Sequence, residues 1–313
     1  GQVIMNWDMI SEILISAVRM ATPLLFVALA ELYSERAGLV NIGLDGIMAF
    51  GSLVGFLVCY WTGNPFLGVL CGALGGVLVN MVYAFCTITL AGQQIVYGMA
   101  LNIFAPALAS FIYRVVFGVS STLAQATLMK TVSIPVLKDI PFFGKLLFDQ
   151  TPMVYAVYLL VIVTVIYFNR TKSGLNFKAV GEYPKAAETM GINVVRTKYL
   201  AAIICGFLAG MGGAYLTTCY VNTYSDGIVA GRGFIALAAV IFGRWSGSGV
   251  LLACLLFGFF DALQLRLQVG TNLLPYQLFQ MIPYVMTLIA LTIFGSKIAG
   301  PKSKGKPYYR EER

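Results

Sequence analysis

Polar side chains interrupt several otherwise continuous apolar runs of this 313-residue chain. Amides and phenols exchange hydrogen bonds with a polar molecule without offering it a fixed charge, which suits a path for a neutral solute. Each of them also suits a hydrogen bond between packed helices. The residues concerned are Asn80, Gln93, Gln94, Tyr97, Asn102, Asp261 and Arg266. Of these, we assign Gln93, Gln94, Tyr97 and Asn102 to a candidate translocation path.

A carboxylate stands at the edge of the second apolar run. Asn41 is placed to cap a helix that begins there, and Asp45 lies one turn in, near the positive end of the helix dipole. Capping alone explains both residues. A carboxylate that enters a membrane nevertheless needs a partner or a wet cavity, so Asn41 and Asp45 also join the candidate path.

Residues 231–245 combine small residues with two arginines. The small residues are explained by close approach of helices. Only eleven uncharged residues separate Arg232 from Arg244, and about 16 Å of helix is too short to cross a bilayer alone. We therefore predict a re-entrant or broken segment with its arginines in a protein-lined cavity. Arg232 and Phe234 complete the candidate path.

A short helix is predicted in the polar loop that follows residue 170. Pro184 suits a first helical position, and Gly191 suits the left-handed conformation just beyond the end. A helix this short needs packing against another surface, either its own protein or a cytosolic partner. Ala186, Ala187 and Met190 are expected to share one face that inserts into a cleft of such a partner. The candidate coupling residues are Gly181, Glu182, Pro184, Ala186, Ala187, Met190 and Gly191.

Several kinds of chemistry are excluded. The chain has no histidine, which removes histidine-based zinc motifs and any Ser-His or Cys-His catalytic pair. No G-x-x-x-x-G-K-[ST] phosphate loop occurs, so if ATP drives this protein, another chain binds it. The six cysteines lie in apolar runs without a C-x-x-C pair and suit packing. We expect no cofactor, no metal and no enzymatic activity in this chain.

The composition of the chain predicts the helices that position the polar residues described above. Hydrophobic residues make up 59% of the chain and charged residues 11%, and the mean hydropathy is +0.83, whereas soluble domains carry about 25% charged residues. Several uncharged runs reach about 20 residues, the length with which a helix crosses about 30 Å of hydrocarbon. The composition predicts an all-α, polytopic transmembrane fold.

We place nine spans after an amphipathic opening segment at residues 7–19, which suits the membrane interface. The seventh span is the short one described above. The predicted spans are residues 20–33, 42–61, 65–90, 93–116, 153–168, 197–219, 228–242, 250–267 and 275–294.

The net charge of the chain is +8, and its basic residues are concentrated in two stretches. Twelve of the 21 Lys and Arg residues fall in residues 170–198 and 297–313, the positive-inside pattern of a membrane protein rather than a nucleic-acid site. Four spans separate these stretches, so both are expected in the cytoplasm and the N-terminus outside. The loop at 118–151 is assigned to the outside. Residues 1–296 form one permease domain with a cytoplasmic coupling loop at 170–198, and residues 297–313 form a basic cytoplasmic tail.

Four motifs carry a resemblance to a known family: Ser34-Glu35-Arg36-Ala37-Gly38 with Asn41-Ile42-Gly43, Gly181 to Ile192, Gly231 to Trp245, and Gly305-Lys306-Pro307-Tyr308. In their order and spacing the chain resembles the permeases of the branched-chain amino acid, ribose and nucleoside group of ABC importers. Within that group it looks most like the smaller permease of nucleoside importers that use a basic-membrane-protein-type binding lipoprotein.

The resemblance implies the partners. They are a second permease subunit, a cytosolic ATPase with two nucleotide-binding domains, an extracytoplasmic substrate-binding lipoprotein, a nucleoside and the lipid of the bacterial cytoplasmic membrane. By similarity, residues 181–192 form the coupling helix that seats in the ATPase. Tyr183 departs from the family, which more often has a small capping residue such as Asn there.

Three alternatives stay open from the residues alone. The first is an ABC permease for ribose or another simple sugar, since sugar permeases share these motifs. The second is an ion-driven secondary transporter in which Asp45 or Asp261 titrates. The third is a membrane scaffold that transports nothing.

Overall fold

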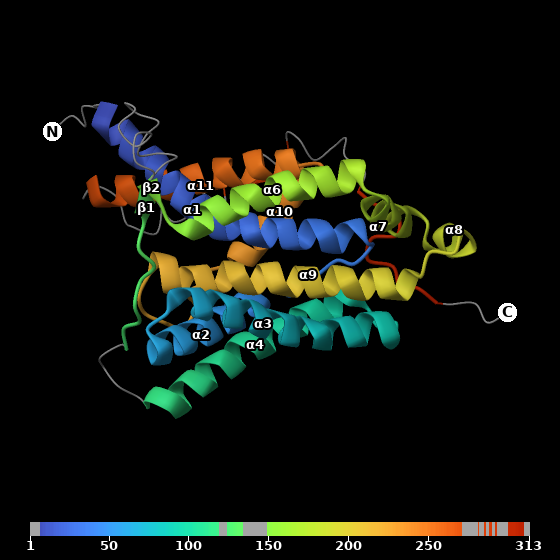
Figure 1. Ribbon diagram of the computed structural model, residues 1–313, viewed down its shortest axis with the longest axis horizontal. Helices are drawn as coiled ribbons and strands as arrows, with labels where there is room; N and C mark the ends of the chain where they lie inside the picture. The colour runs from blue at the N-terminus through green and yellow to red at the C-terminus, as the bar shows by residue number, and fades with distance from the viewer. Residues whose placement is uncertain are drawn as a thin grey trace.

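The computed structural model describes residues 7–118, 124–133, 149–270 and 300–309, and positions 281, 285, 288, 289 and 292. The described chain is a bundle of long helices side by side, with α1 beginning at one end and α8 projecting at the other (Figure 1). Only two very short strands, at the end away from α8, break the helical pattern of the described residues, which confirms the all-α class. The helices are α1 Trp7–Arg36, α2 Leu44–Thr62, α3 Pro65–Ala84, α4 Gln94–Phe117, α6 Pro152–Arg170, α7 Lys172–Glu182, α8 Pro184–Thr189, α9 Val194–Tyr215, α10 Arg232–Phe242 and α11 Gly247–Gly270.

Seven of the described helices are long and apolar enough to span a membrane. Short π-helical turns, Phe85–Thr89 and Leu216–Tyr220, extend α3 and α9. The predicted span at 228–242 becomes α10, which has 11 residues and does not cross alone, as its arginine spacing indicated. The predicted span at 275–294 lies almost entirely outside the described residues. The seven spans are Ser11–Arg36, Leu44–Thr62, Pro65–Thr89, Gln94–Phe117, Pro152–Arg170, Val194–Tyr220 and Gly247–Gln268.

Helix α1 is the centre of the bundle. It packs against α6, α9, α10 and α11, and every residue from Leu24 to Ala30 is at most 1% exposed. A helix that is apolar on all sides needs neighbours on all sides, and α1 has them. The predicted opening segment at 7–19 is continuous with the first span in this single helix.

Helices α2, α3 and α9 meet through glycines, which we call the glycine core: Gly51, Gly72, Gly76, Gly206 and Gly210. A Cβ added at Gly51 would lie 2.7 Å from the Cα of Gly210, and one added at Gly76 would lie 2.6 Å from the same atom. Only residues without a side chain allow backbones this close, and close approach is the main source of helix association in lipid.

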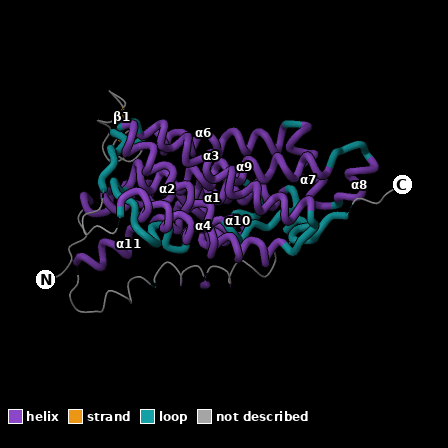
Figure 2. The backbone as a smooth tube through the Cα atoms, turned by 90° about the horizontal axis from the view of Figure 1, so that it is seen from below, coloured by secondary structure: helices purple, strands orange, loops and turns teal. Residues whose placement is uncertain are grey.

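The loop between α4 and α6 contains a small antiparallel pair at the end of the bundle away from α8 (Figures 1 and 2). Strand β1, Val132–Ser133, pairs with β2, Asp149–Gln150. The side chain of Gln150 also accepts a hydrogen bond from Arg19 of α1, at 3.1 Å. The described parts of this loop therefore lie opposite the basic loop, as the charge pattern predicted.

Candidate coupling surface and translocation path

The loop between α6 and α9 folds into α7 and α8 at one end of the bundle. The hydroxyl of Thr171 accepts a hydrogen bond from the backbone N–H of Gly174, at 3.0 Å, and so caps α7. Pro184 opens α8, and Gly191 has a φ of +83° just beyond its end, as the sequence predicted. Gly181 is needed as glycine, because a Cβ there would collide with the backbone carbonyl of Arg36.

The faces of α8 differ from the expectation at one position. Ala186 is exposed and Met190 is 82% exposed, and their spacing puts them on one side of the helix. Ala187 is only 5% exposed, because it packs with Val180 and Val194. The prediction that Ala187 shares the outward face is therefore wrong, since the protein covers that face itself.

The C-terminal tail, here residues 300–309, lies against this loop. The backbone N–H of Ser303 donates to the carbonyl of Gly181 at 2.9 Å, and the amine of Lys302 donates to the hydroxyl of Tyr183 at 2.5 Å. That hydrogen bond raises the pKa of Lys302. The two basic stretches therefore lie at the same end of the bundle, as their charge and the even span count predicted.

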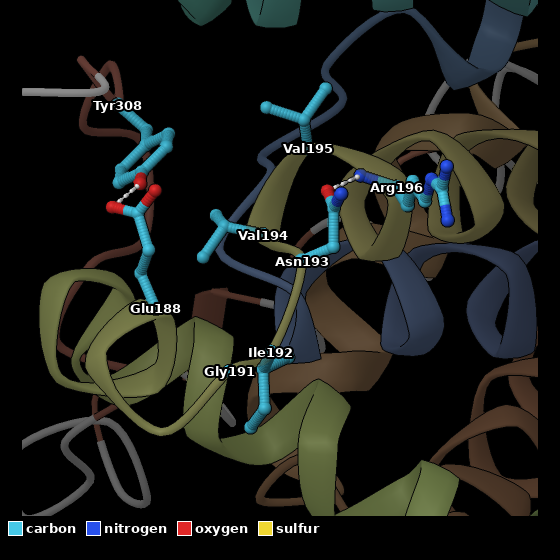
Figure 3. Close-up of a pocket in the computed structure, with 8 residues that line it drawn as sticks. All are labelled: Glu188, Gly191, Ile192, Asn193, Val194, Val195, Arg196 and Tyr308. Atoms are coloured by element: carbon cyan, nitrogen blue, oxygen red, sulfur yellow. Dashed lines mark hydrogen bonds between the residues drawn. The ribbon is translucent and has the colours of Figure 1, made fainter. Parts of the chain in front are cut away.

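Tyr308 links the tail to α8. Its hydroxyl points at the carboxylate of Glu188 and donates a hydrogen bond to it (Figure 3). Beside this pair is a pocket of about 470 Å³ whose other wall is the start of α9. There the side chain of Asn193 caps α9 by accepting from the N–H of Arg196, at 2.9 Å (Figure 3).

The chain between α1 and α2, residues 37–43, returns into the bundle as non-helical backbone. The amide of Asn41 donates to the side chain of Asn80 at 2.7 Å and approaches the sulfur of Cys205 at 3.8 Å. Cys205 lies about 16 Å along α9 from its start at Val194, given a rise of about 1.5 Å per residue. The unwound segment therefore reaches deep into the bundle rather than lying at its end.

Side chains from distant helices satisfy this unwound backbone. The N–H of Val40 donates to Gln94 at 2.7 Å, and the N–H of Asn41 donates to Glu31 at 3.0 Å. Asn102 accepts from the N–H of Gly46 at 2.8 Å and donates to the carbonyl of Ile42 at 2.7 Å. Irregular backbone at membrane depth is stable only where protein or a wet cavity provides such partners. Three of the predicted polar residues, Asn41, Gln94 and Asn102, thus meet at the break.

The predicted cap of α2 is shifted. Asn41 accepts from the N–H of Gly43 at 3.0 Å, but the helix begins only at Leu44 with Gly43 as its N-cap. Asn41 is therefore two residues too early to cap α2, because its own N–H is held in the extended segment by Glu31.

We expect Gln94→Leu to lower the free energy of unfolding by about 1–3 kcal/mol, because it leaves the N–H of Val40 unpaired in a buried site. Gln94 is 1% exposed, whereas its neighbour Gln93 is exposed. Gln93→Leu is the matched control and is expected to change stability by less than about 0.5 kcal/mol. Thermal unfolding of both purified variants in detergent measures the difference, and equal midpoints would contradict this role of Gln94.

A second break lies beside the first. Helix α10 begins at Arg232 after Gly231, which has a φ of +76°. The N–H of Gly233 donates to the carboxylate of Asp45 at 3.0 Å, so the first turns of α2 and α10 touch. Arg232 donates to the carbonyl of Ile228 at 3.1 Å and interacts electrostatically with both Asp45 and Asp261. The N-termini of α2 and α10 and three charged side chains therefore gather at one place in the bundle.

The remaining predicted path residues are spread over the surface. Tyr97 is 38% exposed and Phe234 is 51% exposed. Arg266 does not join the charged group around Arg232, because it forms an ion pair with Glu12 of α1. The structure thus brings together Asp45, Arg232 and Asp261 at the second break and leaves Gln93, Tyr97 and Phe234 on outward faces.

Sequence reasoning missed a buried polar cluster where α1 ends. The carboxylate of Glu35 accepts from the indole N–H of Trp245 and lies 2.7 Å from the amine of Lys304 in the tail. Arg36 donates to the carbonyl of Trp245 through two nitrogens, at 3.0 and 2.6 Å. The sequence does carry one sign of this cluster. Glu31 and Glu35 lie one helical turn apart at the end of an apolar helix, where carboxylates need polar partners.

The chain is similar in sequence to several ABC transporter permeases. NupC of Lactococcus lactis, a nucleoside ABC transporter permease, is 37% identical over 93% of this chain and 95% of its own length. NupQ of Bacillus subtilis, a guanosine ABC transporter permease, is 35% identical over 94% and 95%. TsgC13 of Haloferax volcanii, named provisionally as a glucose ABC transporter permease, is 38% identical over 81% and 77%. The same Lactococcus and Bacillus strains contain more distant relatives, the permeases NupB and NupP, at 27% and 24% identity.

The fold also has a solved neighbour. A structure described as the inward-facing conformation of a metal-chelate type ABC transporter superposes with a TM-score of 0.52 at 12% identity, covering 90% of this chain and 85% of that one. This likeness concerns the fold alone. The model of one protein family, described as the permease component of branched-chain amino acid transport systems, matches residues 13–291. This chain, a multi-pass helical membrane protein, therefore belongs to that family of permease components.

Proposed function

We propose that this chain is the membrane permease subunit of an ATP-driven importer for nucleosides. The observation that carries the proposal is the similarity, over more than nine-tenths of both chains, to permeases named for nucleosides and for guanosine. The sequence contains no G-x-x-x-x-G-K-[ST] loop, so in this proposal ATP is bound by a partner chain and its energy reaches the permease through a contact with that chain. Helix α8, which projects at one end with Ala186 and Met190 exposed, suits that contact.

The same relatives support one of the proposed partners, a second permease. L. lactis and B. subtilis each have two related permeases, NupC with NupB and NupQ with NupP, which supports a heterodimer of this chain with a second permease. A cytosolic ATPase with two nucleotide-binding domains would grip α8, and an extracytoplasmic lipoprotein would deliver the nucleoside to the opposite end. The basic residues of the α7–α8 loop and tail support a cytoplasmic position for both.

The breaks at α2 and α10 are the part of the chain suited to alternating access. Half-helices whose N-termini meet at membrane depth are a common arrangement around transported solutes. Here the carboxylate of Asp45 in α2 accepts a hydrogen bond from the N–H of Gly233 in α10. A displacement of α10 would therefore also move the start of α2. In this proposal the path runs past Asp45, Asn102 and Arg232, and the buried amides Asn41 and Gln94 hold the unwound backbone in shape.

The proposal is tested by uptake into liposomes that contain the intact assembly. We expect labelled guanosine to accumulate when ATP is enclosed with the ATPase and the lipoprotein is outside. Excess unlabelled adenosine or guanosine should compete, and excess glucose should not. Competition by glucose alone would favour the sugar alternative that TsgC13 suggests, and uptake that needs an ion gradient instead of ATP would favour a secondary transporter.

A further inference from the structure

The C-terminal tail is held firmly enough to form part of a binding surface. Besides the contact of its backbone with Gly181, the hydroxyl of Ser303 donates to the carbonyl of Val180 at 3.1 Å. The amine of Lys304 lies 2.7 Å from the carboxylate of Glu35, whose side chain is 1% exposed. Buried ion pairs of this kind fix geometry, because removing one partner leaves an uncompensated charge. The tail is therefore fixed between the α7–α8 loop and the end of α1.

Between the fixed tail and α8 lies a groove of about 630 Å³. Its walls are apolar and aromatic. Tyr183 and Tyr309 are 56% and 65% exposed, and Pro184 and Pro307 stand beside them. Ala186 lines the same groove, so the groove is continuous with the outward face of α8.

Cations surround the groove. Among the described residues that line it, three are lysines, Lys185, Lys302 and Lys306, and one is an acid, Glu182. Lys302 is held over the ring of Tyr183, with its amine 4.9 Å from the ring centroid, which is a cation–π arrangement. An apolar slot with a cationic rim is complementary to an apolar side chain flanked by carboxylates.

We infer that the surface that receives the ATPase is composite, with α8 and the tail together forming a groove that takes an apolar side chain of the ATPase flanked by carboxylates. This inference rests on the proposed function, since it assigns the ATPase to the end of the bundle that carries α8. It adds residues 302–309 to a contact that the sequence placed on residues 181–192. The tail then serves as one wall of the docking site.

The test uses the complete complex purified through a tag on the second permease. Lys306→Glu and Tyr309→Ala change exposed residues of the groove, and Lys172→Glu is the control, because Lys172 is exposed on α7 outside the groove. We expect both groove variants to lower ATPase recovery and ATP-driven uptake about tenfold. Lys306→Glu sets a like charge against the carboxylates of the ATPase, which is strongly unfavourable across an interface, and Tyr309→Ala removes an aromatic wall of the groove. Lys172→Glu should match the wild type.

The outcomes separate the groove from the wider proposal. Wild-type recovery and uptake in both groove variants would overturn the inference while leaving the importer intact. Failure of the wild-type complex to retain an ATPase would overturn the proposed function as well. Loss of uptake with full ATPase recovery, reversed by added anionic lipid, would assign the groove to lipid headgroups instead. Rescue of Lys306→Glu by replacing an ATPase carboxylate with lysine would establish the contact.

Discussion

Ala186→Arg is expected to abolish nucleoside uptake while leaving the permease folded and inserted. Ala186 is exposed on α8 and lines the groove beside the tail, so a long side chain there fills part of the groove and blocks a close-fitting partner. A steric mismatch of about 1–3 kcal/mol lowers docking affinity about tenfold to a hundredfold. ATPase co-purification and uptake by the reconstituted complex measure the loss.

Ala187→Arg is the matched comparison, one residue along the same helix. Ala187 is buried against Val180 and Val194, so arginine there has to open the packing of the loop before any partner is present. We expect less folded permease and a lower unfolding midpoint for Ala187→Arg, but wild-type values of both for Ala186→Arg. Normal uptake by Ala186→Arg would show that this face of α8 receives no partner.

Gly76→Ala is expected to lower the free energy of unfolding by about 1–3 kcal/mol, the usual cost of overpacking. The added Cβ would lie 2.6 Å from the Cα of Gly210 and still closer to the carbonyl of Gly206. Both contacts are backbone atoms, which give way only if α3 and α9 separate. Such a separation also weakens the contacts that bind helices in lipid.

The neighbouring substitution Gly75→Ala is the control for that prediction. Its Cβ would first meet the side chain of Val54, at 3.0 Å, and a side-chain methyl group moves more easily than a backbone. We expect Gly75→Ala to unfold close to the wild-type temperature in detergent and Gly76→Ala to unfold well below it. Equal midpoints would mean that the glycine core does not determine the helix spacing.

The positions of the membrane-spanning helices could be predicted, because a helix that crosses lipid needs a long run of apolar residues and such runs are visible in the sequence. The spans expected at 65–90 and 153–168 appear as Pro65–Thr89 and Pro152–Arg170. The short distance between Arg232 and Arg244 also identified the broken crossing before its geometry was known. The length of an apolar run and the charges that bound it can be read from the sequence without knowledge of the fold.

The contacts of the breaks could not be predicted, because they join residues far apart in the chain. Asn41 looked like a helix cap, yet its N–H is held by Glu31 and its amide by Asn80, and α2 starts later. Ala187 looked like part of an outward face, because periodicity does not say which side of a helix the protein itself covers. The pairing of Glu35 with Lys304 depends on the return of the tail, which no local pattern indicates.

The contact between α8 and a cytosolic ATPase is tested most directly by photocrosslinking from Met190, which is 82% exposed. A photoreactive phenylalanine analogue at that position, expressed in cells with the whole transport system, is predicted to form an ultraviolet-dependent adduct with the ATPase. The same analogue at Leu175, exposed on α7, should crosslink much less. Labelling of a cysteine placed at position 190 by a membrane-impermeant maleimide added outside intact cells, with no ATPase adduct from the photoreactive analogue, would contradict the account.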